Sequence, residues 1–166
     1  MTRIQSGALE VRRAPFMVSD LITQAVSDLR SSLGERVIDV QISDGLPRVL
    51  ADPLLVGQVL VNLLDNANRH APAKTAIAIS ANAYGDSKIA ISVVDHGKGV
   101  HPKDRQAVFE TFVRFDTGGR SGLGLAIAKA FIEAHGDNVW VDDSPGGGAS
   151  FTFTLAAETP TSTVTS

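Results

Sequence analysis

The sequence predicts one α/β domain in which helices cover a mixed β-sheet as a two-layer sandwich. Segments whose apolar residues recur at helical spacing are interspersed with shorter segments in which apolar and polar residues alternate. Each predicted helix or strand therefore has one apolar face, and packing the helices on the sheet buries both faces. The 166 residues suit one domain. We expect it over residues 15–156, after an extension from the preceding region at 1–14 and before a disordered, Thr- and Ser-rich tail at 157–166.

The first part of the chain predicts a helix followed by two strands. A short extended segment is expected at 8–12. From Val18 to Leu33 the apolar residues are spaced as on one face of a helix, and Gly34 follows as a stop signal. Residues 37–42 alternate between apolar and polar, which predicts a strand, and residues 49–50 predict a second, shorter one.

Strong local sequence signals mark both ends of the next helix. Asp52 suits the N-cap because its carboxylate can accept hydrogen bonds from the free backbone N–H groups of the first turn. Pro53 suits the first helical position because it has no backbone N–H that would be left without a partner. The helix should reach about His70, where Pro72 ends it.

The remaining chain predicts four strands and one more long helix. Residues 75–81 and 88–94 alternate and are joined by a hairpin-like turn. A weak helix is expected from Pro102 to Val108, and a mobile loop at 111–121. The last expected elements are a helix from Leu123 to His135 closed by Gly136, and strands at 139–142 and 150–155.

Composition excludes several classes of function. A formal net charge of −3 gives no electrostatic case for nucleic acid as a partner. The chain has no cysteine, so disulfides and thiolate chemistry are excluded. No apolar run approaches the length of a membrane span, so we expect no direct membrane contact.

A pair of asparagines marks one face of the helix that starts at Pro53. Asn62, Asn66 and Arg69 lie at i, i+4 and i+7 and share that face. Amide oxygens one turn apart can ligate Mg²⁺ without adding negative charge, and an arginine can donate to phosphate. The alternative is that these residues are simply the solvated face of an amphipathic helix. The opposite, apolar face is formed by Val56, Leu60, Leu64 and Ala67.

Two glycine-containing segments suit other parts of a nucleotide. Asp95 follows an apolar strand, and its carboxylate can accept a hydrogen bond from the exocyclic amine of adenine; guanine has an acceptor oxygen at the equivalent position, so the same carboxylate would reject it. Gly97 and Gly99 let the backbone close over a flat ring. Gly122 and Gly124 open a helix, whose free N–H groups favour phosphate. The alternatives are a strand-ending turn and an ordinary loop before a helix.

Order and spacing strengthen these separate signals. The motifs at 62–67, 95–99, 109–112 and 122–125 follow one another along the chain. Each alone is weak, but together they predict a pocket for ATP and Mg²⁺.

With these four motifs in this order, the chain resembles the ATP-binding catalytic domain of bacterial sensor histidine kinases. The resemblance covers residues 10–156 and includes Phe109 and Phe112 of the third motif. That family belongs to the superfamily of DNA gyrase, the MutL repair proteins and the large heat-shock chaperone. Within the family, the chain resembles potassium-responsive sensor kinases most.

The resemblance implies a five-stranded mixed sheet packed against three helices, with ATP between helices under a mobile lid. It implies that Asn62 and Asn66 ligate Mg²⁺, that Asp95 binds adenine, and that Arg114 contacts the γ-phosphate. The residues expected to take part in catalysis are Asn62, Asn66, Arg69 and Arg114. The residues expected to bind the nucleotide are Asn66, Arg69, His70, Asp95, Gly97, Gly99, Arg120, Gly122, Leu123 and Gly124.

Several positions depart from the family pattern. Arg69 and His70 stand where Lys and Tyr are usual, and Arg120 stands where the second glycine motif usually begins. Asp137 replaces a glycine after the stop of the last helix, and residues 114–122 are short for a lid.

The chemistry of one position separates the possible activities. ATP-hydrolysing members of the superfamily carry a glutamate where this chain has Asn62, and an amide cannot take a proton from water. A neutral imidazole needs less activation, which favours a histidine kinase over an ATPase or a serine kinase. An ATP-sensing module without phosphotransfer remains the second hypothesis.

None of the four histidines has the sequence context of a phosphate acceptor. They are His70, His96, His101 and His135, and the last lies at a helix end that favours a charged side chain. The resemblance therefore implies an acceptor histidine on a separate dimerisation domain and a response regulator as further partner. It also implies a cytoplasmic location, as part of a membrane-anchored sensor.

Overall fold

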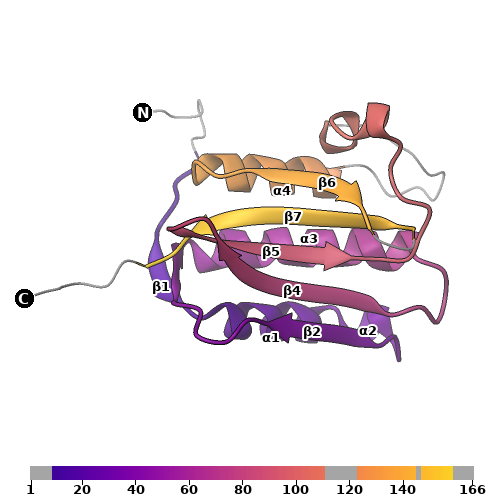
Figure 1. Ribbon diagram of the computed structural model, residues 1–166, viewed down its shortest axis with the longest axis horizontal. Coiled ribbons are helices and arrows are strands. Elements are labelled where there is room, and N and C mark those ends of the chain that lie inside the picture. The colour runs from indigo at the N-terminus through magenta and orange to yellow at the C-terminus, as the bar shows by residue number, and fades with distance from the viewer. Residues whose placement is uncertain (1–8, 111–122, 145–146, 159–166) are drawn as a thin grey trace, which may run out of the picture.

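A computed structural model describes residues 9–110, 123–144 and 147–158 of the chain. Its architecture is a five-stranded sheet with helices on one face (Figure 1). The helices that cover this face are α1 (Val18–Asp28), α3 (Pro53–His70) and α4 (Leu123–Ala134). The two-layer α/β sandwich predicted from the sequence is therefore confirmed.

The sheet is mixed because a single parallel pair lies at one edge. Its strands are β2 (Ile38–Ile42), β4 (Ile77–Tyr84), β5 (Lys88–Val94), β7 (Ala149–Ala156) and β6 (Val139–Asp143), in this spatial order. β2 runs parallel to β4, and the other neighbours are antiparallel. All five strands fall where the sequence analysis expected strands, within a few residues at their ends.

A second sheet, of two strands, lies apart from the main sheet. β1 (Ala14–Phe16) pairs antiparallel with β3 (Val49–Ala51). The extended segment expected at 8–12 was placed too early, because the strand forms where it finds its partner in β3. The helix expected over 18–33 is also divided: α1 ends at Asp28, and a short α2 (Arg30–Leu33) follows before Gly34 at φ +61°.

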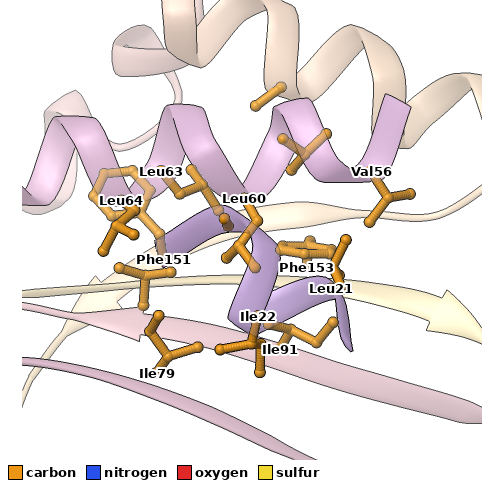
Figure 2. Close-up of a cluster of buried hydrophobic side chains, with 14 of the residues drawn as sticks. Leu21, Ile22, Val56, Leu60, Leu63, Leu64, Ile79, Ile91, Phe151 and Phe153 are labelled. Atoms are coloured by element: carbon orange, nitrogen blue, oxygen red, sulfur yellow. The ribbon is translucent and has the colours of Figure 1, made fainter. Parts of the chain in front are cut away.

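The core lies between the helices and the sheet (Figure 2). The predicted apolar face of α3 is confirmed, since its four residues are all 0% exposed. Fully burying a valine or leucine side chain such as Val56, Leu60 or Leu64 contributes about 1.5–3 kcal/mol to folding. The core side chains labelled in Figure 2 are Leu21, Ile22, Val56, Leu60, Leu63, Leu64, Ile79, Ile91, Phe151 and Phe153.

The start of α3 forms as its local sequence predicts. The Oδ1 atom of Asp52 accepts hydrogen bonds from the backbone N–H groups of Leu54 and Leu55, at 3.0 and 3.2 Å. Burial, the largest single effect, raises the pKa of the Asp52 carboxyl, but the hydrogen bonds that it accepts from the backbone N–H groups of Arg12, Leu55 and Leu54 together lower it by more. The net pKa lies below the ordinary value, so the cap is ionised at neutral pH.

Two further expectations are corrected. The weak helix expected from Pro102 to Val108 consists of two 3-10 turns, η1 (Pro102–Asp104) and η2 (Ala107–Phe109). The tail was expected to be disordered from residue 157, but Ala157 bridges to Val49, and Glu158 pairs with Arg48 at 2.8 Å. The remainder of the tail lies outside the described residues. Within the described part of the chain, no helix is long and apolar enough to cross a membrane.

Candidate functional site

The predicted site residues that the structure describes gather at one end of the sandwich. β5 ends there at Val94, β7 begins there at Ala149, and α4 begins nearby (Figure 1, right). The predicted mobile loop at 111–121, with Arg114 and Arg120, lies outside the described residues, as do Phe112 and Gly122.

A buried carboxylate stands at the end of β5. Asp95 is 3% exposed, and its Oδ1 atom accepts hydrogen bonds from the backbone N–H groups of Gly97 at 2.7 Å and Ala149 at 3.3 Å. Within the described residues, no hydrogen bond reaches the other carboxylate oxygen, Oδ2. A buried oxygen without a donor is costly, so Oδ2 is a site where a donor from a ligand would be stabilised.

Glycines are required around this carboxylate because the backbones approach closely. A Cβ at Gly97 would lie 2.8 Å from the carbonyl oxygen of His70, and one at Gly99 would lie 2.9 Å from that of Gly148. Gly99 also has φ +79°, which favours glycine. The loop after β5 is thereby held against both the end of α3 and the turn between β6 and β7.

Gly148 belongs to the site although it lies outside the four sequence motifs. A Cβ there would lie 2.0 Å from the carbonyl oxygen of Asp95, and its φ is +95°. Ala149, which follows, donates to the Asp95 carboxylate. A run of three glycines before a strand is the signal that indicates such a close approach in the sequence.

Asn62 connects the asparagine helix to the second glycine motif. Its amide nitrogen donates to the carbonyl oxygen of Gly124 at 3.0 Å, and its Oδ1 atom accepts from Gln58 at 2.8 Å. Gly124 lies in the first turn of α4, with its missing Cβ 3.8 Å from the Asn62 side chain. This hydrogen bond joins the asparagine motif at 62–67 to the second glycine motif at 122–125. Leu123 is the first residue of α4.

Asn66, Arg69 and His70 follow on the same helix. Asn66 is half-buried, and its amide makes no hydrogen bond within the described residues. Arg69 pairs with Asp65 at 3.4 Å, and both side chains are about one-third exposed. His70 is exposed at the end of the helix.

These amides fit a magnesium site better than a transition-metal site. No cluster of three His, Cys, Asp or Glu side chains that could hold a metal is present in the described residues. Among the described residues, no donor reaches the Asn66 amide oxygen, and the Asn62 oxygen accepts a hydrogen bond only from the exposed Gln58. Amide oxygens, completed by water and phosphate, are the ligands that Mg²⁺ accepts.

The third motif is anchored in the core by its first aromatic residue. Phe109 is 6% exposed, and its ring meets that of Phe151 edge-on, with centroids 5.9 Å apart. Nearby, Arg105 pairs with Asp143 at 2.7 Å, which ties the 3-10 turns to the end of β6. The segment that leads into the predicted lid is therefore fixed at its base.

His135, directly after α4, is buried and bonded to the start of α3. It is 7% exposed, and its Nε2 atom accepts a hydrogen bond from the backbone N–H of Asp52 at 3.0 Å. Asp137, which replaces a family glycine, is buried as well and is bound by Lys88 and Thr154. The end of α4 is thus held by buried polar contacts that the sequence pattern did not predict.

A helix-covered mixed sheet with asparagines, a buried aspartate and glycines at one end defines a class of nucleotide-binding fold. The chain belongs to the family described as histidine kinase-, DNA gyrase B-, and HSP90-like ATPase, whose sequence model matches residues 51–159.

Curated relatives that the chain resembles are sensor kinases. The adaptive-response sensory kinase SasA of Synechocystis is 32% identical over 155 residues, covering 90% of this chain and 40% of the relative. The sensor protein KdpD of Rathayibacter rathayi is 37% identical over 158 residues, covering 93% of this chain and 18% of the relative. The chain therefore spans less than half the length of these relatives. Because relatives with different names match at similar identity, the closer resemblance to potassium-responsive kinases stays a prediction.

Solved structures of histidine kinases share the fold. The mycobacterial sensor histidine kinase MprB superposes with a TM-score of 0.79 at 25% identity, covering 89% of this chain and 99% of that one. Full-length ShkA in complex with AMPPNP gives a TM-score of 0.80 at 31% identity, covering 93% of this chain and 34% of that one.

Proposed function

We propose that this chain is the ATP-binding kinase domain of a two-component sensor histidine kinase. It would transfer the γ-phosphoryl group of ATP to a histidine on a separate dimerisation domain. The observation that carries the proposal is the buried Asp95 carboxylate, whose Oδ1 atom is engaged by two backbone N–H groups while Oδ2 lacks a donor among the described residues.

Asp95 supports the choice of adenine. An acceptor fixed at this position pairs with the exocyclic amine of adenine, whereas guanine offers an oxygen at the equivalent place. Two like acceptors facing each other in a buried site would leave both without a donor, which costs about 1–3 kcal/mol for each group. The hydrogen bonds to Oδ1 keep the carboxylate from turning to avoid that contact.

The asparagine helix supports the phosphate end of the site. Asn66 and Asn62 would hold Mg²⁺, which would neutralise phosphate charge and favour departure of ADP. Arg69 lies one turn after Asp65 on the same helix and would donate to phosphate oxygens. Gly124, held by Asn62, would bring the first turn of α4 to the phosphates.

Asn62 also disfavours hydrolysis of ATP. A water molecule needs a base to lose its proton as it attacks phosphorus, and the Asn62 amide cannot accept one. A neutral imidazole nitrogen attacks with its own lone pair, so that an N–P bond forms while the bond from phosphorus to the bridging oxygen of ADP breaks. Phosphohistidine then supplies the phosphoryl group to a response regulator, the further partner that the proposal includes.

The acceptor would come from another domain. Among the described histidines, His135 is buried with both ring nitrogens hydrogen-bonded, and His101 caps η1 through its Nδ1 atom. The proposal places this domain in the cytoplasm, as part of a membrane-anchored sensor.

Phosphotransfer in trans tests the proposal. With labelled ATP and Mg²⁺, the chain alone should acquire no stable phosphate. Mixed with the dimerisation domain of its own kinase, it should produce acid-labile phosphate on that domain, slowly because tethering is absent. Asn66→Ala should abolish the transfer, whereas Asn82→Ala, an exposed residue of β4, should not.

Each other result has a distinct meaning. Acid-stable phosphate on the chain itself would indicate a serine kinase and contradict the proposal. Tight ATP binding without transfer at any concentration would leave the ATP-sensing module as the function. Sustained phosphate release without an acceptor would identify an ATPase.

A further inference from the structure

The edge of the main sheet formed by β2 is open in the described part of the chain. β2 pairs with β4 on one side, and none of the described strands lies on the other (Figure 1, bottom). Val37 accepts a hydrogen bond from the N–H of Ile77, and Ser43 donates to the carbonyl of Ala81. Because backbone direction alternates along a strand, odd-numbered residues face β4, and even-numbered ones point their N–H and C=O groups outward.

The outward-facing residues are Ile38, Val40 and Ile42, and their side chains line a groove. The groove lies between β2 and α1 and has a volume of about 290 Å³. From α1 it is lined by Ile22, Val26 and two small polar residues, and from α2 by Arg30, whose guanidinium donates to the carbonyls of Gly34 and Arg36. Val40 is 44% exposed, so the open edge combines unpaired backbone groups with apolar side chains.

The opposite edge of the sheet is protected in a way that β2 is not. β6 ends in two exposed aspartates, Asp142 and Asp143, and Asp143 is paired with Arg105. Charged side chains on an edge strand hinder pairing with another chain. β2 carries one charged residue, Asp39, on the face of the sheet that is away from the helices.

We propose that β2 pairs antiparallel with β2 of a second copy of this chain, about a two-fold axis through Val40. This is the one register in which all three outward-facing residues pair among themselves, Ile38 opposite Ile42 and Val40 opposite itself. Asp39 then faces Gln41 of the second copy, a pair that can hydrogen-bond. An axis through Asp39 would instead place two carboxylates opposite each other.

The sequence of β2 is therefore complementary to itself, which is the requirement for a closed, isologous dimer. The two sheets become continuous across the axis, and the two grooves meet beneath it. This self-complementarity selects a second copy over an unrelated extended peptide, which would need no matching of Asp39 with Gln41.

Sedimentation equilibrium of the full chain tests the dimer. The molar mass should rise from 17.5 kDa toward twice that value as the concentration increases to about 1 mM. Val40→Pro removes an outward N–H and no bond to β4, and it should keep the chain monomeric with an unchanged circular dichroism spectrum. Val40→Lys should act likewise, whereas Leu54→Lys, at an equally apolar but distant position that is 85% exposed, should not.

Charge at position 41 tests the register. Gln41→Lys should tighten the dimer about three- to tenfold by pairing with Asp39, and Gln41→Glu should weaken it by a similar factor. The chain has no cysteine, so Val40→Cys can report proximity without interference. It should crosslink readily on oxidation, because facing residues of such a pair lie about 5.5 Å apart at Cα.

Three results would overturn the proposal. The first is a chain that stays monomeric throughout the concentration range. The second is a dimer that Val40→Pro leaves intact, and the third is a dimer in which Gln41→Cys crosslinks in preference to Val40→Cys.

Discussion

The backbone N–H of Asp52 donates a hydrogen bond to Nε2 of His135, 3.0 Å away, and so joins the start of α3 to the end of α4. The other ring nitrogen, Nδ1, lies 2.8 Å from the carbonyl oxygen of Phe131 and must be the donor there. The His135 ring thus bridges two backbone groups that belong to different helices. The Arg13 guanidinium donates to the His135 carbonyl at 3.0 Å, which adds the N-terminal segment to the junction.

Replacing His135 with leucine should destabilise the fold. The Asp52 N–H and the Phe131 carbonyl would lose their partner in a buried place, at a cost of about 1–3 kcal/mol in the free energy of unfolding. His135→Gln keeps an acceptor for Asp52 and should cost less. Urea denaturation measures both, with His96→Leu at an exposed position as control, expected within about 0.5 kcal/mol of the wild type.

The Asp52 carboxylate should contribute stability that depends on pH. Its pKa is lower in the folded than in the unfolded chain, so the contribution is present above the unfolded pKa of about 4 and is lost as the pH falls through the folded pKa. Asp52→Ala should cost about 1 kcal/mol at pH 7, as for other N-caps. The difference from the wild type should shrink at pH 3. A cost equal at both pH values would mean that the ionised cap contributes nothing.

Local cues predicted α3 and β5 almost to the residue. The cap at Asp52 and the stop at Pro72 act within a few residues of the helix ends, and alternation over 88–94 needs only the strand itself. The position of β1 depends instead on its pairing with β3, far along the chain. Burial of Asp137 likewise depends on Lys88 and Thr154, which no local pattern brings together.

The candidate site likewise contains residues that local motifs predict and contacts that only the fold brings together. The motifs identified Asp95, Gly97 and Asn62 because each lies in a recognisable local sequence. The contact between Gly148 and Asp95, and that between Asn62 and Gly124, join segments more than 50 residues apart and became visible only in the fold. The predicted roles of Arg114 and Arg120 stay predictions, since both lie outside the described residues.

Gly148 should be far less tolerant of alanine than its neighbour Gly147. Both have positive φ, at +95° and +98°, so the backbone strain of substitution is similar. A Cβ at Gly148 would clash with the Asp95 carbonyl, whereas nothing lies within 4 Å of one at Gly147. Gly148→Ala should therefore cost about 1–3 kcal/mol more in the free energy of unfolding. It should also weaken ATP binding in calorimetry, because Asp95 must shift.

Nucleotide choice should depend on Asp95. We expect ATP and ADP to bind and GTP not to bind, because the buried carboxylate offers the base an acceptor. Asp95→Asn can present a donor instead and should weaken ATP binding by about tenfold or more. Asp86→Asn, in the exposed turn after β4, serves as the matched control and should bind as the wild type does. Equal affinity of the wild type for ATP and GTP in calorimetric titrations would contradict the assignment.

Magnesium dependence should reside in Asn66. Its half-buried amide has no hydrogen bond within the described residues, which leaves the oxygen available to a cation bound to ATP. Asn66→Ala should therefore weaken ATP binding strongly in magnesium and only slightly in EDTA, as measured by calorimetry in both buffers. Asn82→Ala removes an exposed amide from β4, outside the candidate site, and should leave both affinities unchanged. A similar loss in both buffers would show that Asn66 acts by packing or by direct contact with the nucleotide.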